Sequence, residues 1–263
     1  MPLAKVPPGL AHGSASSRST PWAWVRHVAV VQWGRTYAEA LRSVCCRAFP
    51  KADIQAHGTG AEVLAALRAK PVDLLLQTLM FPDMDGVDLL RIVMQEKLAV
   101  RVLVASRRRD EQCLYALRNA RFDGIVDTLD ASVETLMEAL HLVAAGHAYV
   151  SPSFRDILID RIVPSDLWHQ FTPAEIRIFT VIGDGSDDHE AALILGLSAA
   201  TVQTHRRNIM HKLGVTSSAK LVREAIRLGM VQITAEGHTI RPGVSREPLL
   251  GEPAPAKFTA RTG

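Results

Sequence analysis

The chain has 263 residues, which is enough for two ordinary domains. Apolar residues make up 48% and charged residues 22% of the chain, values near the averages of globular proteins that exclude a protein disordered throughout. The formal net charge of +3 is mildly basic, so it permits an anionic partner without requiring one.

The three cysteines form neither a disulfide framework nor a paired metal-binding motif, because two of them are adjacent and the third stands alone. No stretch reaches the roughly 18 apolar residues that a membrane span requires. The first 24 residues also lack the continuous apolar core of a secretory signal. We therefore expect a soluble cytoplasmic protein without a metal, another cofactor or contact with a membrane.

Both ends of the chain are rich in Pro, Gly, Ser, Thr and charged residues. A segment of this composition buries too little apolar surface to offset the loss of chain entropy on folding. We predict flexible tails at residues 1–25 and 233–263.

Between residues 26 and 146, short apolar runs alternate with amphipathic stretches. The apolar runs predict strands at residues 27–31, 53–55, 72–76, 100–105 and 124–126. Apolar residues at three- and four-residue spacing predict helices at residues 36–46, 61–69, 87–95, 111–120 and 132–145. This alternation predicts a doubly wound, flavodoxin-like α/β domain with a parallel sheet, followed by a linker at residues 147–166.

After the linker, helix-capping signals follow one another closely. Thr172-Pro173-Ala174-Glu175 combines a capping Thr, a Pro at the first helical position and a Glu three residues after the Thr. Further helix starts are predicted at Asp187, Ser198 and Ser217. Glycines that can close a helix in the left-handed conformation follow at positions 185, 196, 214 and 229. We predict an all-α domain of four helices over residues 167–232.

The third of these helices has two unlike faces. Helical periodicity gathers Val202, Ile209 and Leu213 on one face. The opposite face carries Ala200, Gln203, Thr204, Arg207 and His211. No acidic residue occurs from position 198 to position 222, a stretch that contains four Lys or Arg residues. Because amide, hydroxyl and guanidinium groups on a basic helix can read base edges in the major groove, we predict a helix-turn-helix whose partner is double-stranded DNA.

Two stretches of this region, TPAEIRIFTVIGDG and HEAALILGLSAATVQTHRRNIMHKLGV, carry a family likeness. Over residues 172–231 the chain resembles the LuxR-type helix-turn-helix without a gap. The resemblance implies base-reading side chains at Gln203, Thr204 and Arg207. It implies contacts to the DNA backbone or flanking groups from Arg206, Asn208, His211 and Lys212. For His211, a structural role is an equally good interpretation.

The last helix, which begins after Ser217, carries an apolar stripe. The resemblance implies a homodimer in which two recognition helices read the half-sites of an inverted repeat. Core packing explains part of the stripe as well. A small helical bundle with a merely solvated basic face is the alternative to DNA binding.

In the first half of the chain, four motifs carry a second likeness: VDLLL at residues 72–76, FPDMDG at 81–86, VLVAS at 102–106 and GHAYVSP at 146–152. They resemble the receiver domain of NarL-type response regulators. The resemblance implies a phosphate-accepting Asp four residues before Pro82, where this chain has Thr78. The acidic pair that would bind magnesium reads Gln32 and Trp33, although hard cations need carboxylate oxygens.

Another residue on which receiver phosphorylation depends is also replaced in this chain. The Lys expected after the fifth strand is replaced by Thr128 or Leu129, depending on the alignment, and Ser106 alone keeps its type, at the switch-hydroxyl position. Asp83 and Asp85 match loop residues and not the phosphate acceptor, so we interpret them as structural. We therefore predict a pseudo-receiver, in which the fold is kept and aspartyl phosphorylation is lost.

Arg107, Arg108 and Arg109 follow the fourth strand at the carboxyl edge of the sheet, where doubly wound folds bind ligands. A small anionic ligand or an acidic protein partner would suit this place in the receiver-like domain. A solvated run of arginines is the simpler interpretation.

The leading hypothesis is a bacterial DNA-binding transcription regulator of the LuxR/NarL type that is controlled without aspartyl phosphorylation. The alternative is an interaction module or anti-regulator that forms heterodimers through its receiver-like domain or its last helix. An enzyme is not expected, because the sequence has no phosphate-binding Gly loop, no HExxH motif and no recognisable activated nucleophile.

Overall fold

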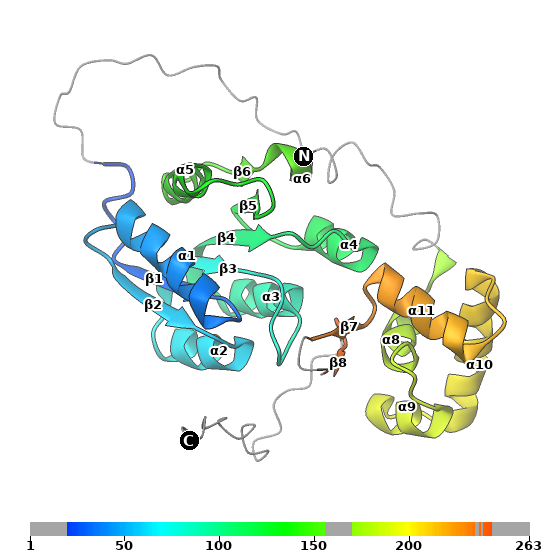
Figure 1. The fold of residues 1–263 in the computed structure, drawn as a ribbon. Helices are drawn as coiled ribbons and strands as arrows, with labels where there is room; N and C mark the ends of the chain where they lie inside the picture. Colours follow the sequence, from blue (N-terminus) through cyan, green and yellow to red (C-terminus); the bar gives the residue numbers. More distant parts are fainter. Residues whose placement is uncertain (1–19, 156–169, 235–236, 238, 244–263) are drawn as a thin grey trace, which may run out of the picture.

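A computed structural model describes residues 20–155, 170–234, 237 and 239–243 (Figure 1). An α/β part built on a parallel sheet precedes a part made of helices. This order confirms the predicted succession of a doubly wound domain and an all-α domain. Of the helices that the structure describes, none is long and apolar enough to cross a membrane.

The sheet has six strands in the order β2-β1-β3-β4-β5-β6, and every neighbouring pair is parallel. The strands are β1 (His27–Val31), β2 (Asp53–His57), β3 (Val72–Gln77), β4 (Ala99–Ser106), β5 (Gly124–Asp127) and β6 (Tyr149–Val150). The strand order reverses between β1 and β3. The carboxyl ends of these two strands therefore lie at the switch point where doubly wound folds bind ligands.

Helices cover both faces of the sheet. They are α1 (Arg35–Ala48), α2 (Gly60–Ala69), α3 (Gly86–Glu96), α4 (Glu111–Asn119) and α5 (Val133–Ala144). Leu41 of α1 and Leu140 of α5 belong to one buried cluster with the strands, whereas Leu67, Leu90 and Leu117 of α2, α3 and α4 belong to the other. The predicted β–α alternation is confirmed for all five units.

The α/β part extends beyond its predicted bounds at both ends. Before β1, Trp22 stacks on His141 with ring centroids 4.1 Å apart, and Val25 is buried. After α5, β6 pairs with β5, and α6 (Pro152–Arg155) buries Phe154 fully. The prediction of a tail up to residue 25 and of a linker from residue 147 is wrong at these positions, because isolated buried side chains leave no periodic signal. Residues 1–19 of the predicted tail and 156–166 of the predicted linker lie outside the described residues.

The helical part contains α8 (Pro173–Ile182), α9 (Asp188–Leu195), α10 (Ala199–Leu213) and α11 (Ser218–Leu228). Each predicted N-cap is confirmed, since the side chains of Thr172, Asp187, Ser198 and Ser217 all accept hydrogen bonds from backbone amides of the first turn. Local capping chemistry therefore fixes where these helices begin.

The chain after α11 folds back as a hairpin. β7 (Gln232–Ile233) pairs with β8 (Thr239–Ile240), and Ile240 is buried. The guanidinium of Arg241 forms an ion pair with Asp184, with Nε and Oδ2 2.8 Å apart. The predicted tail from residue 233 is therefore wrong for the described residues of this hairpin. Two-residue strands are too short to show an alternating pattern.

The hairpin and α11 also contact the α/β part, and Figure 1 shows β7 and β8 between α3 and the helical part. The side-chain amide of Gln232 donates to Oδ2 of Asp85 at 2.5 Å. Gly229, which ends α11 with φ +79°, lies so close to Asp110 that a Cβ atom would be 1.9 Å from its Oδ1. A glycine is thus required at this position both by the backbone conformation and by the neighbouring carboxylate.

Candidate nucleic-acid interface

Helix α10 is held by one apolar face. Val202 and Ile209 are completely buried in the cluster that joins α8, α9, α10 and α11. Ala191 and Ala192 of α9 are buried in the same cluster, and their small side chains allow α9 and α10 to approach closely. The turn between these helices contains Gly196 at φ +66°, which ends α9 in the left-handed conformation. This is the helix-turn-helix arrangement expected from the sequence.

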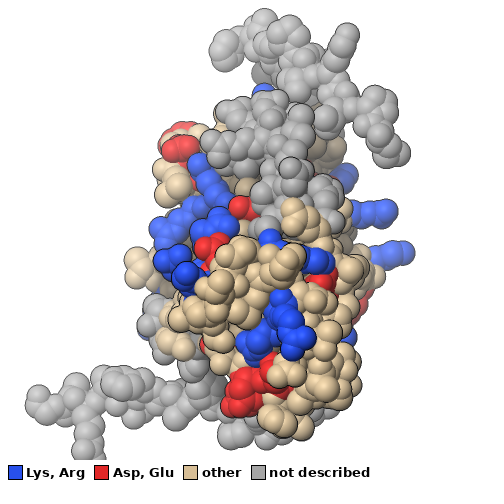
Figure 2. All heavy atoms as spheres, turned by 90° about the vertical axis from the view of Figure 1, so that its right-hand side faces the viewer, with Lys and Arg blue, Asp and Glu red and all other residues tan. Residues whose placement is uncertain are grey.

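The opposite face of α10 is open to solvent. It exposes the side chains of Gln203, Thr204, Arg207, Asn208 and His211. Figure 2 looks onto the side of the molecule where α10 lies in Figure 1, and Lys and Arg side chains gather on it. The Thr204 hydroxyl donates to the Ala200 carbonyl at 2.9 Å, so its oxygen keeps its capacity as an acceptor toward an outside partner. The structure thus brings the three residues expected to read bases together on one exposed face.

Arg206 points away from this exposed face. Its Nε lies 2.7 Å from Oδ1 of Asp188, and its Nη2 donates to the Ser186 carbonyl at 2.7 Å. The Arg206 side chain is only 15% exposed. Its charge therefore ties α10 to the beginning of α9 and is not freely available for a phosphate.

Lys212 is engaged in the same way. Its Nζ lies 2.7 Å from Oε2 and 2.8 Å from Oε1 of Glu175, and it also donates to the Gln170 carbonyl at 2.6 Å. Burial alone would raise the pKa of Glu175, but hydrogen bonds from Lys212 and Thr172 bring it below its ordinary value. Glu175, which the sequence identified as half of a capping box, is thus also the buried anchor of the carboxyl end of α10.

These two ion pairs were missed at the level of sequence. Asp188 and Arg206 are 18 residues apart, and Glu175 and Lys212 are 37 apart. The pairs depend on how α8, α9 and α10 cross, and no local pattern encodes that crossing. A lack of carboxylates within α10 itself indicated a basic surface but could not show which of its cations are already paired.

The carboxyl edge of the sheet contains a cavity of about 320 Å³ at the degenerate phosphorylation site. It is lined by Gln32, Tyr37, Thr78, Leu79, Met80, Ala105, Ser106, Arg107, Thr128 and Leu129. Thr78 Oγ1 lies 3.4 Å from the Val31 carbonyl oxygen, and Ser106 Oγ accepts from the Arg108 amide at 3.0 Å. None of the described residues that line the cavity is a carboxylate. The residues brought together here do not suit magnesium, which prefers carboxylate and water oxygens.

The three consecutive arginines have different surroundings. The Arg108 guanidinium is buried, with Nη1 2.5 Å from Oδ2 of Asp85 and Nε 3.0 Å from Oδ2 of Asp110. Burial would lower the pKa of Arg108, but the two carboxylates raise it above its ordinary value. Arg109 pairs with the buried Asp127. Arg107 is exposed and lines the cavity, and it forms no ion pair within the part of the chain that the structure describes.

The carboxylates of Asp83 and Asp85, near the receiver site, accept hydrogen bonds from backbone amides at the starts of helices. Asp83 accepts from the amides of Gly60 and Ala61 at 3.0 and 2.8 Å and so caps α2 from another loop. Asp85 caps α3 by accepting from the Val87 amide at 2.8 Å. Both roles agree with the structural interpretation made from the sequence.

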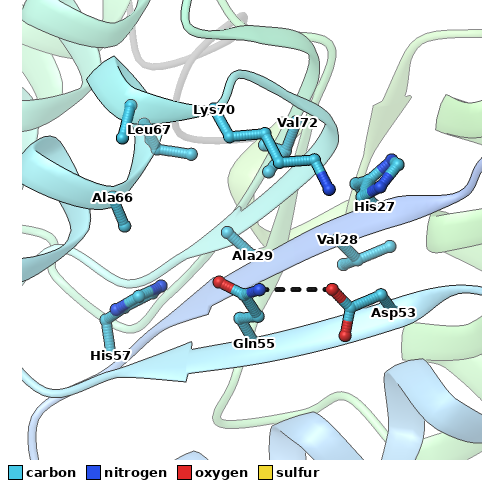
Figure 3. A pocket seen from close by; sticks show the side chains of 11 residues that line it. His27, Val28, Ala29, Asp53, Gln55, His57, Ala66, Leu67, Lys70 and Val72 are labelled. Atoms are coloured by element: carbon cyan, nitrogen blue, oxygen red, sulfur yellow. Dashed lines mark hydrogen bonds between the residues drawn. The ribbon is translucent and has the colours of Figure 1, made fainter.

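A second cavity, of about 270 Å³, lies beside β1, β2 and α2 (Figure 3). Its polar side chains are spread along β1, β2 and the end of α2 and do not converge on one point (Figure 3). Within the cavity the side-chain amide of Gln55 donates to the Asp53 carboxylate at 3.2 Å. Among the described residues, no group of three or more His, Cys, Asp or Glu side chains is placed to hold a metal ion. Cys45 and Cys113 are buried, and burial raises the pKa of each thiol to about 12.

Residues 169–225 match the model of the family described as "Bacterial regulatory proteins, luxR family". The transcriptional regulatory protein UhpA of Escherichia coli strain K12 is 32% identical over 167 residues, which are 63% of this chain and 80% of UhpA. The transcriptional regulatory protein MctR of Rhizobium johnstonii is 29% identical over 157 residues, covering 60% of this chain and 72% of MctR.

A solved structure with a similar fold is RcsB from Salmonella enterica serovar Typhimurium bound to promoter P1flhDC in the presence of the phosphomimetic BeF3−. It shares 18% sequence identity with a TM-score of 0.51, and the match covers 75% of this chain and 96% of RcsB. At this identity the likeness shows the fold alone. Sequence and fold together establish that the chain belongs to the LuxR/NarL type of response regulators, which are bacterial DNA-binding transcription regulators and not enzymes.

Proposed function

We propose that this regulator reads its operator through Gln203, Thr204 and Arg207. The observation that supports this assignment is the exposed face of α10, where an amide, a hydroxyl and a guanidinium lie within four residues of one another, the guanidinium forming no ion pair with the residues that the structure describes. Such groups can bond base edges in the major groove, and Arg is the residue most often found at guanine. Asn208 and His211, also exposed, are positioned beside them for the DNA backbone or flanking groups.

Arg206 and Lys212 have a different role in this proposal. Because both form internal ion pairs, they act first as positioning residues: Arg206 holds the middle of α10 against α9, and Lys212 holds its carboxyl end against α8. Any contact with phosphate would use the part of each side chain that stays exposed. Loss of either would alter the angle of the recognition helix and so weaken binding to all DNA sequences.

The operator is expected to be an inverted repeat bound by a homodimer in the cytoplasm. Helix α11 supports this proposal, since Ile226 is 45% exposed although the other large apolar residues of this helix are buried or half-buried. Chromatin immunoprecipitation and sequencing would identify bound fragments, and gel shifts would then measure affinity at several salt concentrations. We expect affinity to fall steeply as salt rises, because basic side chains release counterions from DNA. A chain that binds no fragment even at low salt would instead support the heterodimerising anti-regulator.

We further propose that control does not involve aspartyl phosphorylation. The cavity at the receiver site offers Thr78 in place of a nucleophilic carboxylate and Gln32 in place of a metal ligand. Incubation of the full chain with acetyl phosphate and magnesium should leave its intact mass unchanged. A phosphorylated Asp detected by mass spectrometry would contradict the proposal.

A further inference from the structure

The cavity at the degenerate phosphorylation site combines several hydroxyl groups with a cation that forms no ion pair among the described residues. Arg107 is exposed at its rim, and Thr78, Ser106 and Thr128 line it. The Ser106 and Thr128 hydroxyls and the Arg107 guanidinium can donate hydrogen bonds to an anion, whereas the Thr78 hydroxyl lies 3.4 Å from the Val31 carbonyl oxygen. Within the described lining no carboxylate is present to repel that anion.

The two buried aspartates near the cavity pair with other arginines and do not offset the charge of Arg107. Asp127, at the end of β5, is 1% exposed and accepts hydrogen bonds from Ser153 at 2.6 Å and from the Leu129 amide at 2.9 Å. It also pairs with Arg109. Asp85 likewise forms an ion pair, with Arg108. Within the described part of the chain, neither of these carboxylates is therefore left to pair with Arg107.

The first turn of α1 also adds positive potential to the cavity. Tyr37 in this turn lines the cavity, and the N-cap residue, Gly34, has no side chain with which to cap the helix. The positive end of the helix dipole is thus left without a side-chain acceptor beside an already cationic cavity. This feature adds to the preference for an anion but would not create it alone.

Three of the other lining side chains are large, apolar and exposed. Tyr37 is 41%, Met80 48% and Leu129 60% exposed, and all three border the cavity. Trp33, which follows the lining residue Gln32, is 42% exposed. In a phosphorylating receiver the positions of Trp33 and Leu129 would belong to charged residues under the resemblance described above. Apolar side chains in these places would serve a ligand with an apolar body.

We propose that this cavity binds a small amphipathic organic anion, with its carboxylate, sulfonate or phosphate group against Arg107 and the hydroxyls and its apolar body against Tyr37, Met80 and Leu129. The volume of about 320 Å³ is at the lower end of the roughly 300–1,000 Å³ of small-molecule sites, so it suits a compact ligand. An inorganic anion would leave the apolar walls uncovered. The binding is non-covalent and does not depend on the DNA contacts proposed for α10.

The test uses 1-anilinonaphthalene-8-sulfonate, an amphipathic anion whose fluorescence rises in an apolar site, with calorimetry to establish stoichiometry. The full-length protein should bind one molecule saturably at this site. Arg107→Gln should weaken binding about tenfold, in keeping with loss of a charged hydrogen bond. Leu129→Asn, at a largely exposed position, should weaken it several-fold. Arg121→Gln is the matched control, because Arg121 is also exposed but precedes β5 at the opposite edge of the sheet.

Two further probes separate charge from apolar contact. The uncharged N-phenyl-1-naphthylamine should bind at least about tenfold more weakly than the sulfonate, since it lacks the anionic group. Inorganic phosphate should compete only weakly. The proposal is overturned if no saturable binding occurs, if Arg107→Gln binds as the wild type does, or if the uncharged probe binds equally well. Phosphate binding as tight as that of the sulfonate would show that the apolar walls contribute nothing, and would overturn the amphipathic class.

Discussion

Arg108 and Arg207 both lie in basic runs of the sequence, but the structure surrounds them differently. The Arg108 side chain is 6% exposed and bonded to two aspartates, whereas Arg207 lies on the open face of α10. In each region a neighbouring residue has the opposite surroundings: within the described residues Arg107 forms no ion pair, whereas Arg206 is paired with Asp188. Basic composition therefore indicates where a cationic surface can form, while acidic residues elsewhere in the chain decide which cations remain available.

The comparison extends to the two parts of the molecule. In the helical part, the paired Arg206 and Lys212 fix helix α10, which also carries the exposed Arg207. In the receiver-like part, the paired arginines hold the loop after β4, and the same aspartate that binds Arg108 also accepts from Gln232 of the hairpin. Substitutions at paired positions should therefore change stability first and binding only through the position of α10, whereas substitutions at exposed, unpaired positions such as Arg207 should change binding alone.

The largest effect on stability is expected from Asp85→Ala. It leaves the buried Arg108 guanidinium without its closest partner and removes the cap of α3, so unfolding of the α/β part should lose about 3–5 kcal/mol. Denaturant unfolding followed by circular dichroism measures this loss. Glu39→Ala is the control, because its pair with Arg42 is exposed to solvent and should contribute little to stability. Equal losses in the two variants would contradict the account.

A smaller loss is expected from Lys212→Met. Methionine keeps an apolar side chain near Phe171 but leaves the Glu175 carboxylate without its cation, which should cost about 2 kcal/mol because the pair is only partly buried. Thermal and denaturant unfolding of the full chain would report it. Lys220→Met, at an exposed position of the same part, should be nearly neutral. If Lys212→Met were equally neutral, the ion pair would have no role in fixing α10.

The pH dependence of stability should reveal the same pair. The pKa of Glu175 is lower in the folded chain than its ordinary value, so the ionised carboxylate stabilises the fold above the ordinary carboxyl range near about pH 4.3. That contribution is lost as the pH falls through the folded pKa. The difference in unfolding free energy between the wild type and Glu175→Gln should be widest near neutral pH and should close in acid. A difference that stayed constant with pH would show that the charge of Glu175 is not the cause.

The parts of this structure that sequence predicted well are those with local causes. The caps at Thr172 and Asp187 act within one helical turn, and the strands of the sheet core are continuous apolar runs. The short strands β6, β7 and β8 were missed because two residues carry no periodicity. Within the candidate interface, the two faces of α10 followed from helical spacing. The internal engagement of Arg206 and Lys212 did not, because it depends on contacts between helices.

The most direct test compares wild type and Arg207→Ala on the operator and on unrelated DNA of equal length at one salt concentration. The account predicts a loss of about 1–3 kcal/mol on the operator, together with relaxed base preference, and a much smaller loss on unrelated DNA. Such a result would place Arg207 at a base edge. An equal loss on both DNAs would mean that the exposed face of α10 attracts the duplex without reading it.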